Sequence, residues 1–182
     1  MKKGSVFWFT GLSGAGKTTI AEAAKRVLED KGYKVLILDG DDVRARFHAD
    51  LGFSEKDIKK NNFLISELCK SSREKYDIIM VPIISPYAES RRKAKDFLGD
   101  GFYEIFIDAG FECVVSRDVK GLYAMMANGE IDNMIGFSPE SPYEAPKYPD
   151  LVISSGKRSQ EDSVKEFLDF ICTSLKEEVR QK

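Results

Sequence analysis

The sequence predicts a three-layer α/β/α sandwich with a mainly parallel sheet, and three observations support this prediction. Apolar runs rich in β-branched residues alternate along the chain with helical patterns, which is the order found in α/β folds. These runs are almost uniformly apolar, as expected for strands that are buried on both faces of a parallel sheet. The chain has 182 residues, of which 42% are hydrophobic. We therefore expect a single domain over residues 1–182 with a substantial core.

The strands of this sheet are expected where five short apolar runs occur. The first run, Val6-Phe7-Trp8-Phe9-Thr10, is followed by a glycine-rich loop, and the third, Ile78–Ile84, is the longest. Short apolar runs bounded by turn residues are consistent with fully buried strands. In chain order, the expected strands are Ser5–Thr10, Lys34–Asp39, Ile78–Ile84, Glu104–Asp108 and Leu151–Ser154.

Helical patterns lie between these runs and after the last one. Strands that alternate with helices form a sheet with helices on both faces, and such sheets bind ligands at the carboxyl ends of their strands. Residues that directly follow a strand are therefore candidates for the functional site. In chain order, the expected helices are Thr18–Lys31, Ser54–Lys75, Pro86–Phe97, Phe111–Val115 and Ser159–Glu178.

The segment Val119–Pro149 fits neither pattern, because glycines and four prolines interrupt it. A connection of this length in a compact domain is usually functional or disordered.

The loop after the first strand reads Gly11-Leu12-Ser13-Gly14-Ala15-Gly16-Lys17-Thr18-Thr19 and matches the pattern G-x-x-x-x-G-K-[ST]. Its glycines allow main-chain N–H groups to surround phosphate oxygens, and the following helix N-terminus favours the negative charge. Lys17 is expected to neutralise the β- and γ-phosphates of ATP, and the Thr18 hydroxyl to ligate Mg²⁺. The alternative is a glycine-rich turn without a ligand. The residues predicted to bind ATP are Gly11, Ser13, Gly14, Ala15, Gly16, Lys17, Thr18 and Thr19.

A second group of polar residues, Asp39, Asp41 and Arg44, follows the second strand. Phosphoryl transfer requires a carboxylate that orients the attacking hydroxyl or accepts its proton, and carboxylates that help to hold Mg²⁺. Arg44 can bind a phosphate or sulfate group with two parallel hydrogen bonds. The alternative is that the aspartates only cap a helix that begins near Val43.

Composition excludes several classes of function. The formal net charge is −2, with 28 basic and 30 acidic side chains, so the chain lacks the basic character of a nucleic-acid-binding protein. The longest apolar stretch, Ile78–Ile84, is too short to span a membrane. The cysteines Cys69, Cys113 and Cys172 are widely spaced and odd in number, as expected for thiols in a reducing compartment. We therefore expect a cytoplasmic protein with no nucleic-acid or membrane partner.

Seven stretches of the chain together resemble the adenylyl-sulfate kinase family, whose members use ATP to phosphorylate the 3′-hydroxyl of adenylyl sulfate. The resemblance implies a P-loop kinase sandwich with a mobile lid, here at about residues 117–149, and an assembly that is often a homodimer. In chain order, the stretches are GLSGAGKTT (11–19), LDGDDVR (38–44), DLGFS (50–54), ISPY (84–87), RDVKGLY (117–123), NGEI (128–131) and SPYEAP (141–146).

The resemblance also implies roles for individual residues. Asp41 would be the base or orienting group and Asp39 its partner on the magnesium side, so that Lys17, Asp39, Asp41 and Arg117 form the catalytic set. A second set would contact the acceptor nucleotide, with Phe53 stacking on its base and Ser85 beside its phosphate and the metal. Arg117 would close over both nucleotides as part of the lid. The residues of the acceptor set are Arg44, Phe53, Asn61, Ser85 and Lys120.

The chain departs from the family pattern around the acceptor substrate. Ile58 stands where the family usually has arginine, and Phe63 and Leu64 replace an arginine pair. Methionines also replace family residues of the lid, at Met125, Met126 and Met134.

Three functional hypotheses remain open after these departures. The chain is an adenylyl-sulfate kinase that uses Arg44, Lys59, Lys60 and Lys120 instead; or it phosphorylates another nucleotidyl conjugate, such as cytidine diphosphoramidate; or it is a non-catalytic nucleotide-binding homologue.

Overall fold

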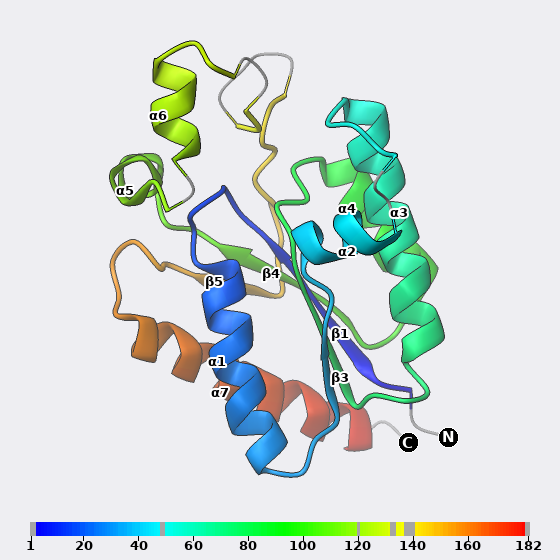
Figure 1. Ribbon diagram of the computed structural model, residues 1–182. Coiled ribbons are helices and arrows are strands. Elements are labelled where there is room, and N and C mark those ends of the chain that lie inside the picture. Colours follow the sequence, from blue (N-terminus) through cyan, green and yellow to red (C-terminus); the bar gives the residue numbers. More distant parts are fainter. Residues whose placement is uncertain (1–2, 48–49, 120, 132–133, 137–140, 181–182) are drawn as a thin grey trace.

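The computed structural model describes residues 3–47, 50–119, 121–131, 134–136 and 141–180 (Figure 1). Its five strands form one sheet in which every neighbouring pair is parallel, in the order β2-β3-β1-β4-β5. All five strands lie where the apolar runs predicted them, and several are shorter by a few residues. Their bounds are β1 Ser5–Thr10, β2 Val35–Ile37, β3 Ile78–Pro82, β4 Phe102–Ile107 and β5 Leu151–Ile153.

Five helices confirm the helical patterns of the sequence to within about three residues at most ends, as is usual for helix boundaries. They are α1 Lys17–Asp30, α3 Glu55–Ser72, α4 Ala88–Leu98, α5 Phe111–Arg117 and α7 Gln160–Arg180.

Two further helices, α2 (Gly40–Phe47) and α6 (Leu122–Ala127), were not among the predicted elements. Helices this short are marginal by themselves and depend on contacts with the rest of the fold. The capping alternative placed a helix start near Val43, and α2 begins three residues earlier, at Gly40, so that Asp41 and Asp42 lie in its first turn.

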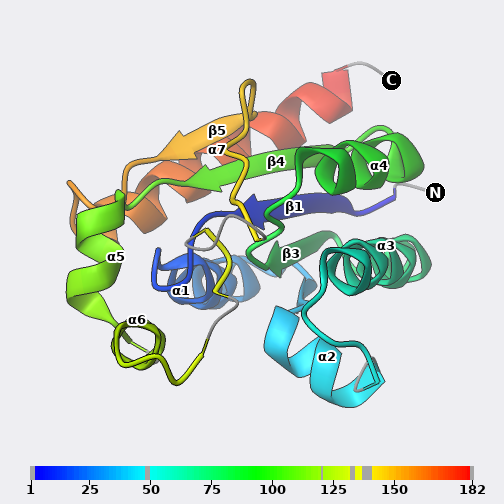
Figure 2. The same ribbon diagram turned by 90° about the horizontal axis from the view of Figure 1, so that it is seen from above.

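The helices cover both faces of the sheet, as Figure 2 shows: α1 and α7 lie on one face, and α3 and α4 on the other. Successive side chains of β1 point to opposite faces. Phe7 and Phe9 belong to the core beneath α1 and α7, whereas Val6 and Trp8 belong to the core beneath α3 and α4. Both cores consist of buried apolar side chains, one on each face of the sheet, which confirms the predicted three-layer sandwich.

The glycine-rich loop leaves β1 at the carboxyl edge of the sheet, and α5 and α6 lie beyond this edge (Figure 2). A Cβ atom on Gly11 would lie 2.5 Å from the carbonyl oxygen of Ile107, so only glycine allows the loop to pass so close to β4. Gly16 has a φ of 97° directly before α1, a conformation that glycine adopts without strain. None of the helices in the described part of the chain has the length and apolar character that a membrane span requires.

Candidate active site

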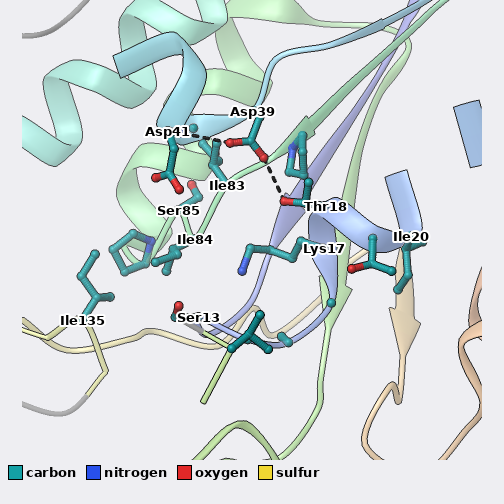
Figure 3. Close-up of a pocket in the computed structure, with 18 of the residues that line it drawn as sticks. Ser13, Lys17, Thr18, Ile20, Asp39, Asp41, Ile83, Ile84, Ser85 and Ile135 are labelled. Carbon is teal, nitrogen blue, oxygen red and sulfur yellow. Dashed lines mark hydrogen bonds between the residues drawn. The ribbon is translucent and has the colours of Figure 1, made fainter. Parts of the chain in front are cut away.

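A cavity of about 510 Å³ lies at the carboxyl edge of the sheet (Figure 3), and this volume is typical of small-molecule sites. It brings together most of the residues that the sequence predicted for the site. Gly11 is not among the lining residues, because it lies at the base of the loop against Ile107. Lys120 falls outside the described residues. The predicted residues that line the cavity are Ser13, Gly14, Ala15, Gly16, Lys17, Thr18, Thr19, Asp39, Asp41, Arg44, Phe53, Asn61, Ser85 and Arg117.

The phosphate-binding loop is held in shape by side chains from distant parts of the chain. Tyr123 of α6 donates its hydroxyl to the carbonyl oxygen of Ser13 at 2.7 Å, and Ser155 donates to that of Ala15 at 2.7 Å. Desolvation raises the pKa of Tyr123 to about 12, so its hydroxyl remains a donor at neutral pH. The sequence did not predict either contact, although Tyr123 lies inside the RDVKGLY stretch.

Lys17 is buried in this loop, and its ammonium group donates to the carbonyl oxygens of Gly11 and Leu12 at 2.9 and 2.7 Å. The lysine charge is thereby kept beside the loop amides, where an anionic phosphate chain would bind. Figure 3 shows Lys17 beside Thr18, a dashed line from Thr18 to Asp39, and Asp41 beyond Asp39.

Asp39 connects the loop to the second half of the site. One carboxylate oxygen accepts a hydrogen bond from the Thr18 hydroxyl at 2.8 Å, and the other accepts the main-chain N–H of Asp41 at 3.0 Å. The main-chain carbonyl of Asp39 accepts the first bond of α2, from the N–H of Val43. Asp39 therefore caps α2, as the alternative interpretation of the sequence held, and also reaches the Thr18 hydroxyl.

The Thr18–Asp39 pair has the chemistry that Mg²⁺ requires. A hydroxyl and a carboxylate oxygen lie within hydrogen-bonding distance, and hard cations prefer oxygen ligands. Across the residues that the structure describes, no cluster of three or more His, Cys, Asp or Glu side chains could enclose a metal. Mg²⁺ rarely uses such a cluster, because it usually keeps one or two protein ligands together with phosphates and water.

Asp41 and Arg44 lie on α2 and face the cavity in different ways. Asp41 is exposed in the first turn of the helix. One guanidinium nitrogen of Arg44 donates hydrogen bonds to the carbonyl oxygens of Leu51 and Gly52, at 2.7 and 2.8 Å. The guanidinium also lies 4.6 Å from the ring centre of Phe53. In this arrangement Arg44 holds the loop that presents Phe53, whose ring is 65% exposed.

The changed positions of the acceptor side do not all face the cavity. Ile58 lines it and is only 4% exposed, whereas Phe63 packs on the Phe97 ring outside it at 5.3 Å. Leu64 is also absent from the lining residues. Among the three replaced arginine positions, only Ile58 therefore alters the cavity wall.

Lys59 and Lys60 do not line the cavity either, so the structure gives no support to the expectation that they replace the missing arginines. Lys59 pairs with Glu55 at 2.7 Å and with Glu89 at 2.6 Å. These hydrogen bonds, first with Glu55 and then with Glu89, raise the pKa of Lys59. The charge of Lys59 is thus compensated on the outer surface of α3.

Arg117 lies at the end of α5 and lines the cavity, with one nitrogen donating to the carbonyl oxygen of Ser155 at 2.9 Å. The next residue, Asp118, has a φ of 30° and accepts the main-chain N–H groups of Tyr123 and Ala124, each at 3.0 Å. Asp118 thereby caps α6 and turns the chain from Arg117 toward the tyrosine that contacts the loop.

The C-terminal part of the predicted lid is fastened to the edge of the sheet. The Tyr143 hydroxyl lies 2.9 Å from the Thr10 hydroxyl, and the N–H of Glu144 donates to the carbonyl of Pro86 at 2.9 Å. Buried Arg91 bridges Glu144 and Ser85, by donating to the carbonyl oxygens of both at 2.6 and 2.7 Å. Tyr143 and Glu144 belong to the SPYEAP stretch, so the motif was visible in the sequence, but its contacts were not.

The five-stranded parallel sheet, the glycine-rich loop with its lysine and threonine, and the carboxylates that face it define a P-loop kinase. The chain belongs to the adenylylsulphate kinase family, because the family model matches residues 3–154.

Individual relatives agree with this assignment over nearly the whole chain. An adenylyl-sulfate kinase of Bacillus velezensis is 42% identical over 174 residues, which cover 95% of this chain and 87% of the relative. One of Halothermothrix orenii is 43% identical and covers 93% of this chain and 90% of its own. Among solved structures, the Mycobacterium tuberculosis APS kinase CysC in complex with AMPPNP and APS superposes with a TM-score of 0.87 at 38% identity, over 94% of this chain and 99% of that one.

Proposed function

We propose that this protein transfers the γ-phosphate of ATP to the 3′-hydroxyl of adenylyl sulfate, giving ADP and 3′-phosphoadenylyl sulfate. The observation that carries this proposal is the hydrogen-bonded series Thr18–Asp39–Asp41, which joins the phosphate-binding loop to the acceptor side of one cavity. Family membership supplies the acceptor, and the geometry supplies the means of transfer.

The donor half of the reaction uses the loop from Gly11 to Thr19. Its main-chain amides bind the phosphates, and Lys17 neutralises the charge that develops on the β- and γ-phosphates. Thr18 and Asp39 would hold Mg²⁺, which would neutralise part of the negative charge of the phosphates. Ser155 and Tyr123 keep the loop in its shape by donating hydrogen bonds to its carbonyl oxygens.

The acceptor half uses residues on the opposite wall. Asp41 orients the attacking hydroxyl and accepts its proton, a role that requires a carboxylate within hydrogen-bonding reach of that oxygen. Phe53 stacks on the base, and Arg44, Asn61 and Ser85 contact the rest of the nucleotide. Arg117, together with Lys120, closes over the site, which excludes water and strengthens the ionic contacts.

A second acceptor is favoured by one observation. Ile58 presents an apolar side chain to the cavity where the family usually presents arginine. An acceptor that needs no cation at this position, such as cytidine diphosphoramidate, is therefore the alternative substrate. Turnover on any acceptor would exclude the third possibility, a non-catalytic nucleotide-binding homologue.

A coupled ADP-release assay tests the proposal. Purified protein is supplied with Mg²⁺–ATP and, in separate reactions, with adenylyl sulfate, cytidine diphosphoramidate, nucleoside monophosphates or water alone. We expect multiple turnovers with adenylyl sulfate, loss of turnover in Lys17→Ala, and unchanged turnover in Arg26→Ala, which alters an exposed residue of the same helix. Release of ADP with cytidine diphosphoramidate only would assign the alternative, and no release with any acceptor would refute a kinase.

We also propose that residues 1–182 form one domain whose lid is at about residues 117–149, and that the protein acts as a homodimer in the cytoplasm. The homodimer rests on the family resemblance. Light scattering coupled to size-exclusion chromatography would give a mass near twice 20.5 kDa for the homodimer, and a mass near the single-chain value would refute it.

A further inference from the structure

The cavity extends along the carboxyl edge of the sheet on both sides of the phosphate-binding loop. This loop follows β1, the middle strand, and Figure 2 shows β3 on one side of β1 and β4 and β5 on the other. Asp41 and Ser85, which are assigned above to the acceptor side, follow β2 and β3. At the other end, the cavity is lined by residues that follow β5, among them Arg158, Gln160 and Ser163. The proposed function gives these three residues no role.

This second end of the cavity has a fixed position relative to the phosphate-binding loop. Ser155 donates its hydroxyl to the carbonyl oxygen of Ala15 at 2.7 Å, and Arg117 donates to the carbonyl oxygen of Ser155 at 2.9 Å. In phosphoryl transfer, the attacking and leaving oxygens lie roughly in line with the transferred group. An acceptor that approaches from the β2 and β3 side therefore places the leaving ADP on the β5 side. The base of the donor nucleotide is then expected beside the residues that follow β5.

Arg158 presents a guanidinium group at this end of the cavity, and one carboxylate restricts its orientation. A nitrogen of Arg158 donates to Glu166, in the second turn of α7, at 2.7 Å. In the part of the chain that the structure describes, Glu166 is the only hydrogen-bond partner of this guanidinium. The Arg158 side chain is 48% exposed, so a flat ligand in the cavity can cover its exposed face. Both residues lie beyond residues 3–154, which the family model matches, and the family assignment therefore gives the pair no role.

The other lining residues offer few surfaces on which a flat aromatic base can stack. Phe53 is the only aromatic side chain among the described residues that line the cavity, and it lies on the acceptor side. Guanidinium groups are planar and weakly hydrated and stack on aromatic rings, and the attraction of a cation to the face of a ring strengthens this contact. At the β5 end, the planar cations are Arg117 and Arg158. The sequence predicted Arg117 as a site residue, whereas Arg158 is identified by the structure.

We infer that the Arg158 guanidinium packs on the face of the purine base of the donor nucleotide, and that Glu166 is the positioning residue that orients it. The inference rests on the proposed function for the identity of the donor, ATP. It does not depend on the acceptor, because the acceptor binds at the opposite end of the cavity. The contact concerns the base alone, since the loop from Gly11 to Thr19 binds the phosphates.

Isothermal titration calorimetry with the non-hydrolysable ATP analogue AMP-PNP and Mg²⁺ tests the contact with the base. Arg158→Ala should weaken binding by about 3- to 30-fold, the range expected for the loss of a cation–π contact that the ligand desolvates. The matched control is Lys157→Ala, because Lys157 is the exposed neighbour and does not line the cavity. This control should leave the affinity unchanged. Unchanged affinity in Arg158→Ala, or an equal loss in Lys157→Ala, would overturn the inference.

Two comparisons separate a contact with the base from a contact with the phosphates. Inorganic tripolyphosphate carries no base, so its affinity, measured by competition with AMP-PNP, should be the same in Arg158→Ala as in the native protein. Arg158→Lys keeps the charge but replaces the planar group by a strongly hydrated ammonium, and should recover little of the affinity for AMP-PNP. Weaker binding of tripolyphosphate in Arg158→Ala, or full recovery in Arg158→Lys, would indicate a phosphate contact and contradict the inference.

The role of Glu166 is tested by a disruptive and a conservative substitution. Glu166→Ala should weaken AMP-PNP binding by a smaller factor than Arg158→Ala does. Glu166→Gln should keep most of the affinity, because its amide oxygen can accept the same hydrogen bond. The variant that combines Arg158→Ala with Glu166→Ala should bind as Arg158→Ala does, since Glu166 acts only through Arg158. Additive losses in this double variant would refute the positioning role, as would tighter binding in Glu166→Ala, which would mean that Glu166 holds Arg158 away from the base.

The native protein keeps this inference distinguishable from the proposed function. If the native protein does not bind AMP-PNP, the donor half of the proposed function is refuted, and the role of Arg158 with it. If the native protein binds AMP-PNP and Arg158→Ala binds it equally well, only the role of Arg158 is refuted, and the proposed transfer to an acceptor is unaffected.

Discussion

Replacing Arg91 by methionine removes one cation from the interior and is expected to destabilise the fold strongly. The guanidinium is 3% exposed and donates to Glu104 at 2.5 Å, to the Ser85 carbonyl at 2.7 Å and to the Glu144 carbonyl at 2.6 Å. The Glu104 side chain is only 15% exposed, so it would be left as a nearly buried carboxylate without its partner. Breaking a buried ion pair from one side typically costs about 3–5 kcal/mol.

Urea denaturation measures this loss as a change in the free energy of unfolding. Arg92→Met is the matched control, because the neighbouring Arg92 is exposed on the same helix, and surface substitutions usually change stability by less than about 0.5 kcal/mol. Adding Glu104→Gln to Arg91→Met should restore part of the stability, since no unpaired carboxylate then remains. If Arg91→Met were as stable as Arg92→Met, or if Glu104→Gln made it less stable still, the reasoning would be refuted.

Three further predictions concern two residues that line the cavity and one ion-paired carboxylate on the surface of α4. Asp41→Asn should lower kcat by about 10²- to 10⁴-fold with little change in ATP affinity. The control Asp42→Asn should change neither kcat nor ATP affinity. Equal losses of kcat and ATP affinity in Asp41→Asn would instead indicate that Asp41 holds the metal. Ile58→Arg should lower the KM for adenylyl sulfate by about tenfold or more through a charge-assisted bond, and an unchanged or higher KM would argue for a different acceptor. Hydrogen bonds, first with Lys59 and then with Lys93, lower the pKa of Glu89 from 4.5 to about 2. The ionised Glu89 side chain therefore contributes fully to the stability of the fold above pH 4.5, and this contribution is lost as the pH falls toward 2. The difference in unfolding free energy between the native protein and Glu89→Gln, measured in urea at pH 6 and pH 3, should therefore shrink on acidification, and a constant difference would contradict this.

The strands were predictable because burial on both faces leaves a local mark, an uninterrupted apolar run. The phosphate-binding loop was equally predictable, because its glycines, Lys17 and Thr18 are adjacent in the chain. The helices α2 and α6 left no such mark. Both are short, and each depends on an aspartate outside it, Asp39 for α2 and Asp118 for α6.

The surroundings of the site were not predictable from local patterns. Ser85 meets Trp8 across 77 positions and Asn62 across 23, and Tyr123 reaches Ser13 across 110. In the sequence, Trp8 belongs to an apolar run expected to form a buried strand, and nothing near it in the chain identifies the partner of its indole N–H. Lys59 was expected to serve the acceptor, but α3 turns it toward Glu55 and Glu89.

By itself, the sequence determined the layers of the sandwich, the order of its elements and the position of the glycine-rich loop, because each of these follows from side chains close together along the chain. Only the tertiary structure decided which changed position faces the cavity, how the loop is held, and which buried side chains contact Ser85. Those outcomes depend on directions and distances between segments far apart in the chain, and a hydrogen bond is made or lost within a few tenths of an ångström.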